Sequence, residues 1–130
     1  MTEAHPVDPA DALVIDPSRS WSSDEVWDTA NRIAHLARAA TRGGKRRVAV
    51  FAENAGESVV AHLGGLRSGA SVVAVNSHLA APEAAYQLAT GDVALLIAGP
   101  ATAERARDAA ATAGNCEIRV WDDAGWAEWL

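Results

Sequence analysis

The fold is decided by three short segments, RVAVF at residues 47–51, SVVAV at 71–75 and VALLIA at 93–98. Each is rich in valine or leucine and almost free of polar residues, which is typical of strands that are covered on both faces. A fourth strand is expected at 117–121. The segments between the strands predict helices, at residues 55–68, 81–89 and 100–113. This alternation predicts an α/β fold, a mostly parallel sheet flanked by helices.

The sequence before the first of these strands predicts a small N-terminal β-hairpin followed by a helix. Two apolar stretches, 12–15 and 19–21, lie on either side of the turn-forming tripeptide Asp-Pro-Ser at 16–18. Ser22 and Glu25 then have the spacing of a capping box, in which each side chain binds the backbone amide of the other residue. We therefore expect a helix to begin here and to end at the glycine pair 43–44.

Two adjacent glycines, Gly64 and Gly65, lie inside the helix expected at 55–68. A glycine in a helix interior costs about 1 kcal/mol relative to alanine. The pair therefore predicts a close approach of this helix to the sheet.

The length and composition of the chain limit its domain organisation and its possible partners. The chain has 130 residues, so we expect a flexible arm at 1–11 and a single α/β domain at 12–130. Its formal net charge of -6 argues against nucleic acid or an anionic membrane as partners. The sequence contains one cysteine and neither a signal peptide nor an apolar run long enough to span a membrane. These features predict a cytoplasmic protein.

The loops that follow the strands are where a parallel α/β sheet is expected to bind a ligand. None of them carries the G-x-G-x-x-G turn of a dinucleotide site or a G-x-x-x-x-G-K-[ST] phosphate loop. The tripeptide Gly-Gly-Lys at 43–45 precedes a strand, so it cannot cradle a phosphate and is interpreted as a solvated basic segment.

Only two side chains in these loops are candidates for contacting a ligand or a partner, Asn76 and His78. Asn54 is interpreted as a helix cap. Cys116 has no expected base or helix N-terminus beside it and is interpreted as structural. The four histidines do not have metal-ligand spacing. We therefore predict no metal site and no catalytic residue in this chain.

Three of the five tryptophans lie in the last ten residues, Trp121, Trp126 and Trp129. Aromatic side chains are usually buried, so one interpretation is a lid over the domain's own core. The other is an apolar seam that contacts a protein partner.

With these elements in order, the sequence resembles the N-terminal portion of an AMP-forming acyl-CoA synthetase, of the adenylate-forming ligase superfamily. The resemblance runs from about residue 10 to the end. It departs from the family after Asn76, where Ser77 and His78 replace a frequent proline and a basic residue. The residues that carry it are Arg19–Ser22 through Asn31–Ala34, Arg47–Val50 with Glu53 and Asn54, Gly69–Asn76, and Glu83–Leu88.

The resemblance implies an enzyme that activates a carboxylic acid with ATP and Mg²⁺ and passes the acyl group to a thiol, usually coenzyme A. Family chemistry depends on a Ser/Thr/Gly-rich phosphate loop and a mobile C-terminal domain, and no comparable loop lies within these 130 residues. We therefore expect an N-terminal segment or a split subunit of such a ligase, inactive alone and binding no cofactor by itself. The alternative is a stand-alone module that docks on a partner ligase or a carrier protein.

Overall fold

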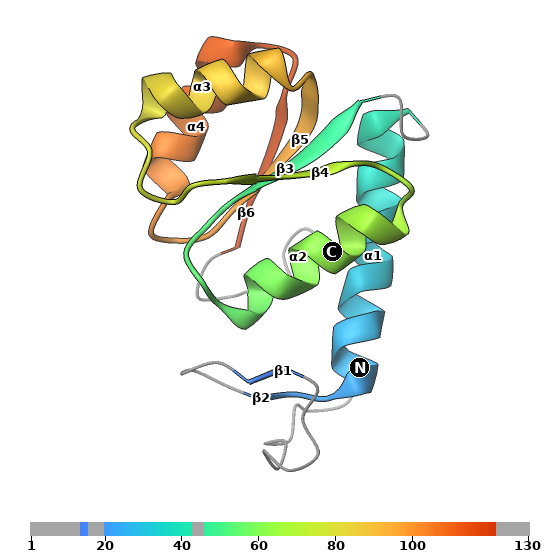
Figure 1. Ribbon diagram of the computed structural model, residues 1–130. Helices are drawn as coiled ribbons and strands as arrows, with labels where there is room; N and C mark the ends of the chain where they lie inside the picture. Colours follow the sequence, from blue (N-terminus) through green and yellow to red (C-terminus); the bar gives the residue numbers. More distant parts are fainter. Residues whose placement is uncertain (1–13, 16–19, 43–45, 122–130) are drawn as a thin grey trace.

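The computed structural model describes residues 14–15, 20–42 and 46–121. Within them a two-stranded hairpin precedes an alternation of helices and strands (Figure 1). The elements are β1 (Val14–Ile15), β2 (Ser20–Trp21), α1 (Ser23–Thr41), β3 (Arg47–Phe51), α2 (Gly56–Arg67), β4 (Val72–Val75), α3 (Ala81–Thr90), β5 (Val93–Ala98), α4 (Ala103–Ala113) and β6 (Glu117–Val120).

The main sheet of the described residues has four strands in the order β4-β3-β5-β6, and every neighbouring pair is parallel. In the hairpin, Val14 pairs with Trp21 and Ile15 with Ser20, antiparallel. Both features confirm the predicted α/β fold with its small N-terminal hairpin.

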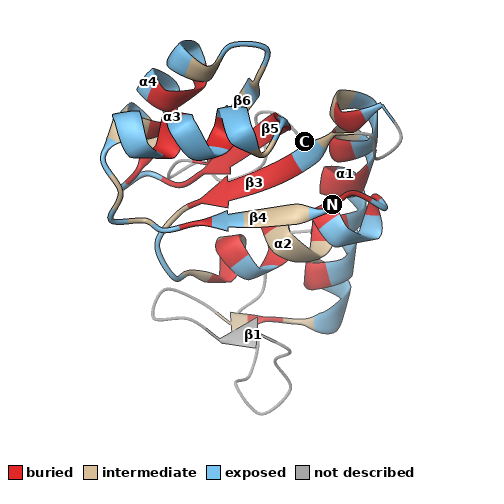
Figure 2. Ribbon diagram, turned by 45° about the horizontal axis from the view of Figure 1, so that its top comes forward, coloured by how far each residue is buried: buried red, intermediate tan, exposed pale blue. Residues whose placement is uncertain are grey.

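Two helices cover each face of the sheet. The backbone alternates side chains between the faces, so Val48 and Val50 of β3 pack with α1 and α2, whereas Ala49 and Phe51 pack with α3 and α4. Figure 2 shows β3 buried along most of its length between these layers. The core is therefore divided by the sheet into two clusters, and this explains why the strand sequences are apolar at every position.

Helix α1 begins where its capping box predicts. The Ser22 hydroxyl accepts from the Glu25 amide at 3.1 Å, and the Glu25 carboxylate accepts from the Ser22 amide at 3.1 Å. The helix ends at Thr41, and Arg42 adopts a left-handed conformation with φ 54°. The end therefore comes just before the predicted glycine pair, which lies outside the described residues.

The two glycines of α2 make close approaches in two different directions. A Cβ atom on Gly65 would lie 2.6 Å from Cγ2 of Val72, so this glycine lets the helix approach the sheet as predicted. A Cβ atom on Gly64 would instead lie 2.6 Å from Cβ of Ile33. Gly64 therefore brings α2 against α1, which the sequence did not reveal.

Two local predictions differ from the structure. The N-cap of α2 is Ala55 and makes no side-chain hydrogen bond, so the interpretation of Asn54 as a cap is wrong. Helix α4 begins at Ala103 and not at Pro100, because residues after β5 first form a turn in which the Thr102 amide donates to the Gly99 carbonyl. Among the described residues, no helix combines the length and hydropathy needed to cross a bilayer.

Candidate functional site

The strand order places a topological switch point between β3 and β5. From β3 the chain continues to β4 on one side of β3 and then to β5 on its other side. Helices α1 and α2 cover one face of the sheet, and α3 and α4 cover the other. The loops beyond the carboxyl ends of these two strands therefore diverge, which is where ligands bind in open α/β sheets.

Thr102 occupies this position. Its side chain is buried, and its hydroxyl donates to the carbonyl oxygen of Phe51, the last residue of β3. The hydroxyl oxygen also lies 3.3 Å from the Gly99 carbonyl oxygen in the loop after β5. Thr102 therefore joins the ends of the two central strands.

Trp121 packs beside this position and follows β6. Its amide donates to the Ala98 carbonyl at 3.0 Å, and its side chain is only 4% exposed. A Cβ atom on Gly99 would lie 2.7 Å from Cζ2 of the indole, so the absence of a side chain there makes room for the ring. The structure thus places Trp121 in the core cluster beneath α1 and α2. Trp126 and Trp129, named with it as an interface, lie outside the described residues.

The loop between β4 and α3 carries the two predicted contact residues, Asn76 and His78. The Asn76 side-chain oxygen accepts from the His78 amide at 2.9 Å, so the asparagine shapes the turn. Both residues are exposed. The structure brings them together through this turn and leaves the imidazole at the surface.

Arg105 of α4 fixes the same loop from the opposite side. Its guanidinium donates to the carbonyl oxygens of Ser77 and Leu79, at 2.8 and 2.7 Å. It also lies 5.3 Å from the centre of the Phe51 ring, within the range of a cation–π contact. A single arginine therefore links the loop, the end of β3 and helix α4 into one rigid edge.

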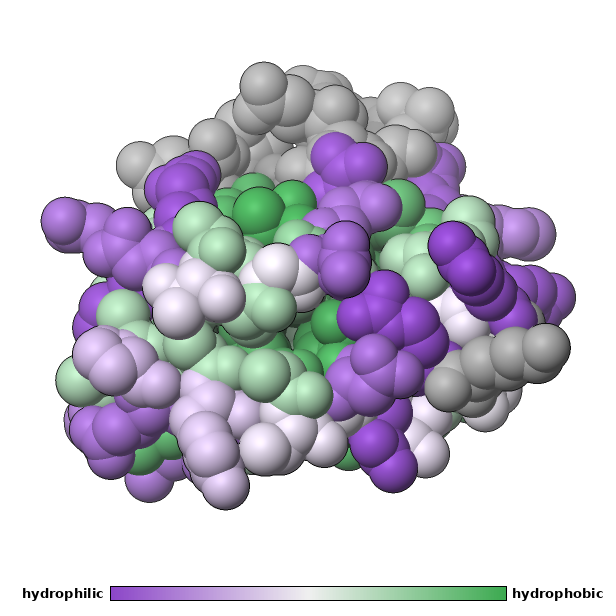
Figure 3. Space-filling model, turned by 90° about the horizontal axis from the view of Figure 1, so that it is seen from above, coloured by the Kyte–Doolittle hydropathy of each residue, from purple (hydrophilic) through white to green (hydrophobic). Residues whose placement is uncertain are grey.

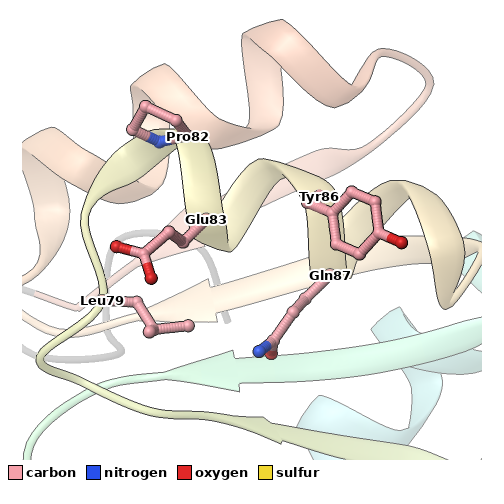
Figure 4. A pocket seen from close by; sticks show the side chains of 5 residues that line it. All are labelled: Leu79, Pro82, Glu83, Tyr86 and Gln87. Atoms are coloured by element: carbon pink, nitrogen blue, oxygen red, sulfur yellow. The ribbon is translucent and has the colours of Figure 1, made fainter.

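A hollow of about 410 Å³ opens next to this edge along α3. Figure 4 shows Gln87 reaching from the helix toward the strands, with Leu79 beside Glu83 near the start of the helix. Pro82 and Tyr86 complete the lining, and Tyr86 is 71% exposed. One carboxylate, one amide and a phenol around an apolar residue could bind a small polar molecule. They do not include a nucleophile paired with a base.

The surface that carries α3 and α4 mixes apolar and charged residues. Figure 3 shows apolar and weakly polar residues across the middle of this view, between hydrophilic residues at its sides. On α4, three of the six alanines, Ala106, Ala109 and Ala110, are buried, whereas three charged residues, Glu104, Arg107 and Asp108, are exposed.

The remaining reactive groups of the described residues include the acidic and imidazole side chains and Cys116. Within the described ranges, no three His, Cys, Asp or Glu residues are close enough together to hold a metal ion. Burial raises the pKa of Cys116 to about 11, with Arg46 lowering it and Glu117 raising it to smaller extents. The thiol is therefore protonated at neutral pH and is a poor nucleophile.

Sequence reasoning missed Thr102 and Arg105, the two residues that organise the strand-end loops. In the sequence Thr102 falls inside the helix expected at 100–113, and nothing there indicates a bond to a strand 51 residues earlier. Arg105 lies inside an ordinary helical pattern. Neither has a local sequence signal, because both roles depend on which strands become neighbours.

The class of this chain follows from its sequence, and its fold agrees with that class. Its sequence matches the family model described as AMP-binding enzyme over residues 2–129, and the chain belongs to this family. No curated protein matches the sequence significantly.

Several solved structures share the fold over most of this chain. A benzoate CoA ligase from Burkholderia xenovorans LB400 is 22% identical with a TM-score of 0.76, and the match covers 90% of this chain and 24% of the ligase chain. ATP-bound MatB from Rhodopseudomonas palustris is 21% identical with a TM-score of 0.72, over 92% and 24%. A fatty acyl CoA synthetase from Mycobacterium tuberculosis is 26% identical with a TM-score of 0.68, over 84% and 22%. The chain thus spans about a quarter of the length of these structures.

Proposed function

We propose that this chain supplies the N-terminal part of an ATP-dependent ligase that activates a carboxylic acid as an acyl-adenylate and passes the acyl group to a thiol. The observation that carries the proposal is the family match over residues 2–129. The CoA ligases and the acyl CoA synthetase among the similar structures support coenzyme A as the thiol. ATP, Mg²⁺ and coenzyme A belong to the complete enzyme in this proposal, and the cytoplasm is its location.

We further propose that the 130-residue chain alone does not adenylate carboxylic acids. Stabilising a triphosphate as it reacts requires several donors aimed at its oxygens. At the switch point, however, the Thr102 hydroxyl is bonded to Phe51, and beside it the Arg105 guanidinium is bonded to carbonyls of the β4–α3 loop. These donors hold the loops together, and this use of polar groups supports the proposed inactivity of the chain alone.

Carboxylate-dependent exchange between ATP and pyrophosphate tests this expectation directly. The purified chain, with Mg²⁺ and a panel of aliphatic and aromatic acids, should show no exchange above a control without acid. Exchange that depends on the acid would contradict the proposed inactivity, although it would support ligase chemistry.

The ligase role itself is tested with the native protein. Antibodies against the folded chain should recover, from its cells, a polypeptide or an assembly that contains a Ser/Thr/Gly-rich loop ending in lysine and that adenylates an acid. Recovery of an assembly with neither the loop nor the activity would overturn the ligase proposal.

A second candidate function is a binding module that docks on a partner ligase or a carrier protein. It is favoured by β4, which ends the strand order of the described sheet and leaves Val72 and Val73 partly exposed. The same recovery experiment separates the two candidates. A separate, intact ligase or a carrier protein bound to the chain would support docking, whereas a partner that carries only the missing parts would support a split enzyme.

A further inference from the structure

A second hollow, of about 520 Å³, lies at the surface between helices α1 and α2, on the other face of the sheet from α3. Figure 1 shows α2 lying across α1. The lining residues are Asn31, Ala34, His35 and Arg38 of α1, together with Arg67 of α2. We call this hollow the α1–α2 groove.

The groove follows from helix geometry. Its four residues on α1 are spaced at i, i+3, i+4 and i+7, which places them on one side of the helix. Arg67 comes three residues after Gly64, whose missing side chain lets α2 approach Ile33 and the Ala30 carbonyl. The close crossing therefore positions a guanidinium of one helix beside the polar stripe of the other.

The charge of the groove is unlike that of the whole chain. It contains two guanidiniums and no carboxylate, although the chain has a net charge of -6. Ion pairs elsewhere in the described residues engage Arg32 with Asp28, Arg46 with Asp92 and Arg119 with Glu117. Neither groove arginine forms such a pair with a carboxylate of the described residues.

One of these cations is also held in place. The Arg67 guanidinium lies 5.4 Å from the centre of the Trp27 ring, a cation–π distance. This contact restricts the side chain without using its hydrogen-bond donors in an ion pair. Less conformational freedom is then lost when the guanidinium binds an anion.

We propose that the α1–α2 groove binds a small phosphate-bearing anion. Guanidinium groups present planar pairs of donors that match phosphate oxygens, and the Asn31 amide and His35 ring add donors of their own. The small side chain of Ala34 leaves room for the anion between them. This site lies apart from the strand-end loops and does not depend on the proposed ligase activity.

A structural role for these arginines makes a different prediction. Arg38 and Arg67 lie in the last turns of their helices, where positive charge stabilises the helix end. Such a role would change the melting temperature on substitution but would not produce saturable binding. Binding is therefore the measurement that separates the two roles.

The experiment is a titration of the ¹⁵N-labelled 130-residue chain with inorganic pyrophosphate, with AMP and with adenosine, followed by NMR. Pyrophosphate or AMP should cause saturable shifts of the backbone amides of α1 around residues 31–38 and of the Arg67 side-chain Nε–H. Adenosine, which lacks phosphate, should not. A stronger response to AMP than to pyrophosphate would indicate a nucleotide, and the reverse an inorganic or non-nucleotide phosphate.

Arg38→Gln and Arg67→Gln should each weaken binding about tenfold, which is one lost charge-assisted interaction. Arg32→Gln is the matched control on α1, because Arg32 pairs with Asp28 outside the groove, and it should change affinity less than about twofold. The proposal is overturned if no saturable shift appears, if adenosine binds equally well, or if Arg32→Gln weakens binding as much as Arg38→Gln.

Discussion

At the scale of single residues, several polar side chains stabilise the fold through hydrogen bonds to the chain itself. The Thr102 hydroxyl, the Asn76 side chain and the Arg105 guanidinium all lie at the strand ends, where a ligand is expected, and all bond to the chain itself. The residue types that the sequence offers as binding candidates are therefore also the ones that hold the loops. The sequence cannot separate these two uses, because both require the same donors and acceptors.

Thr102→Val should lower the free energy of unfolding by about 1–3 kcal/mol, since the Phe51 carbonyl loses a buried hydrogen bond while the side-chain shape is nearly kept. Urea denaturation measures the change. Thr102→Ser keeps the hydroxyl and is expected to lose much less. No loss for Thr102→Val, or a larger loss for Thr102→Ser, would mean that the methyl group and not the hydrogen bond stabilises this position.

Cys116 should react slowly with iodoacetamide, with a rate that rises toward a midpoint near pH 11 because its folded pKa is raised to about 11. In denaturant the midpoint should return to about 8.5. A midpoint between pH 8 and 9 in the folded protein would contradict the burial of this thiol.

The same raised pKa predicts the pH dependence of stability. The folded state favours the neutral thiol, so this contribution is fully present below the unfolded pKa, about 8.5, and is lost as pH rises toward 11. Denaturation of Cys116→Ser between pH 8 and 11 provides the comparison, because this variant should lack that part of the decline.

At the scale of elements, local signals predicted where most helices and strands lie. β3 and β5 have the boundaries expected from their apolar runs, and α1 begins at its capping box. The prediction was weaker where tertiary contacts set the ends. Thr102 bonds to β3 and delays the start of α4, and α2 begins without the cap that Asn54 suggested.

The packing of α2 on the sheet can be tested with a double-mutant cycle. Gly65→Ala should destabilise the protein by about 1–3 kcal/mol despite the better helix propensity of alanine, because the new Cβ would meet Val72 Cγ2 at 2.6 Å. In a Val72→Ala background this clash is removed, so the same change should cost less or become stabilising. Additive effects of the two substitutions would show that the close approach is not the cause.

At the scale of the whole molecule, the α/β class followed from the alternation of elements, whereas the order of the strands did not. The sequence shows that β3, β4, β5 and β6 are strands, yet the contact of β5 with β3 depends on α3 crossing the opposite face from α2. The switch point and the roles of Thr102 and Arg105 follow from that order. The α1–α2 groove likewise depends on a crossing that only the close contact of Gly64 with Ile33 reveals.

The strand order predicts a gradient of protection against hydrogen exchange. Amides in β3 and β5 lie between two strands and beneath helices on both faces, so they should exchange most slowly, and those of β4 faster because it ends the sheet order. Exchange followed by NMR on the native chain gives these rates. Equal protection of β4 and β3 in a monomer would contradict the arrangement.

The central position of β3 also has a consequence for synthesis on the ribosome. It is the first strand of the main sheet to be made; β4 then adds to one of its edges, β5 to the other, and β6 to β5. Each newly translated strand therefore meets an edge that is still vacant, and no pair already formed has to separate to admit it. The sheet can grow outward in the direction of translation, which lessens the time that a nascent apolar strand spends uncovered.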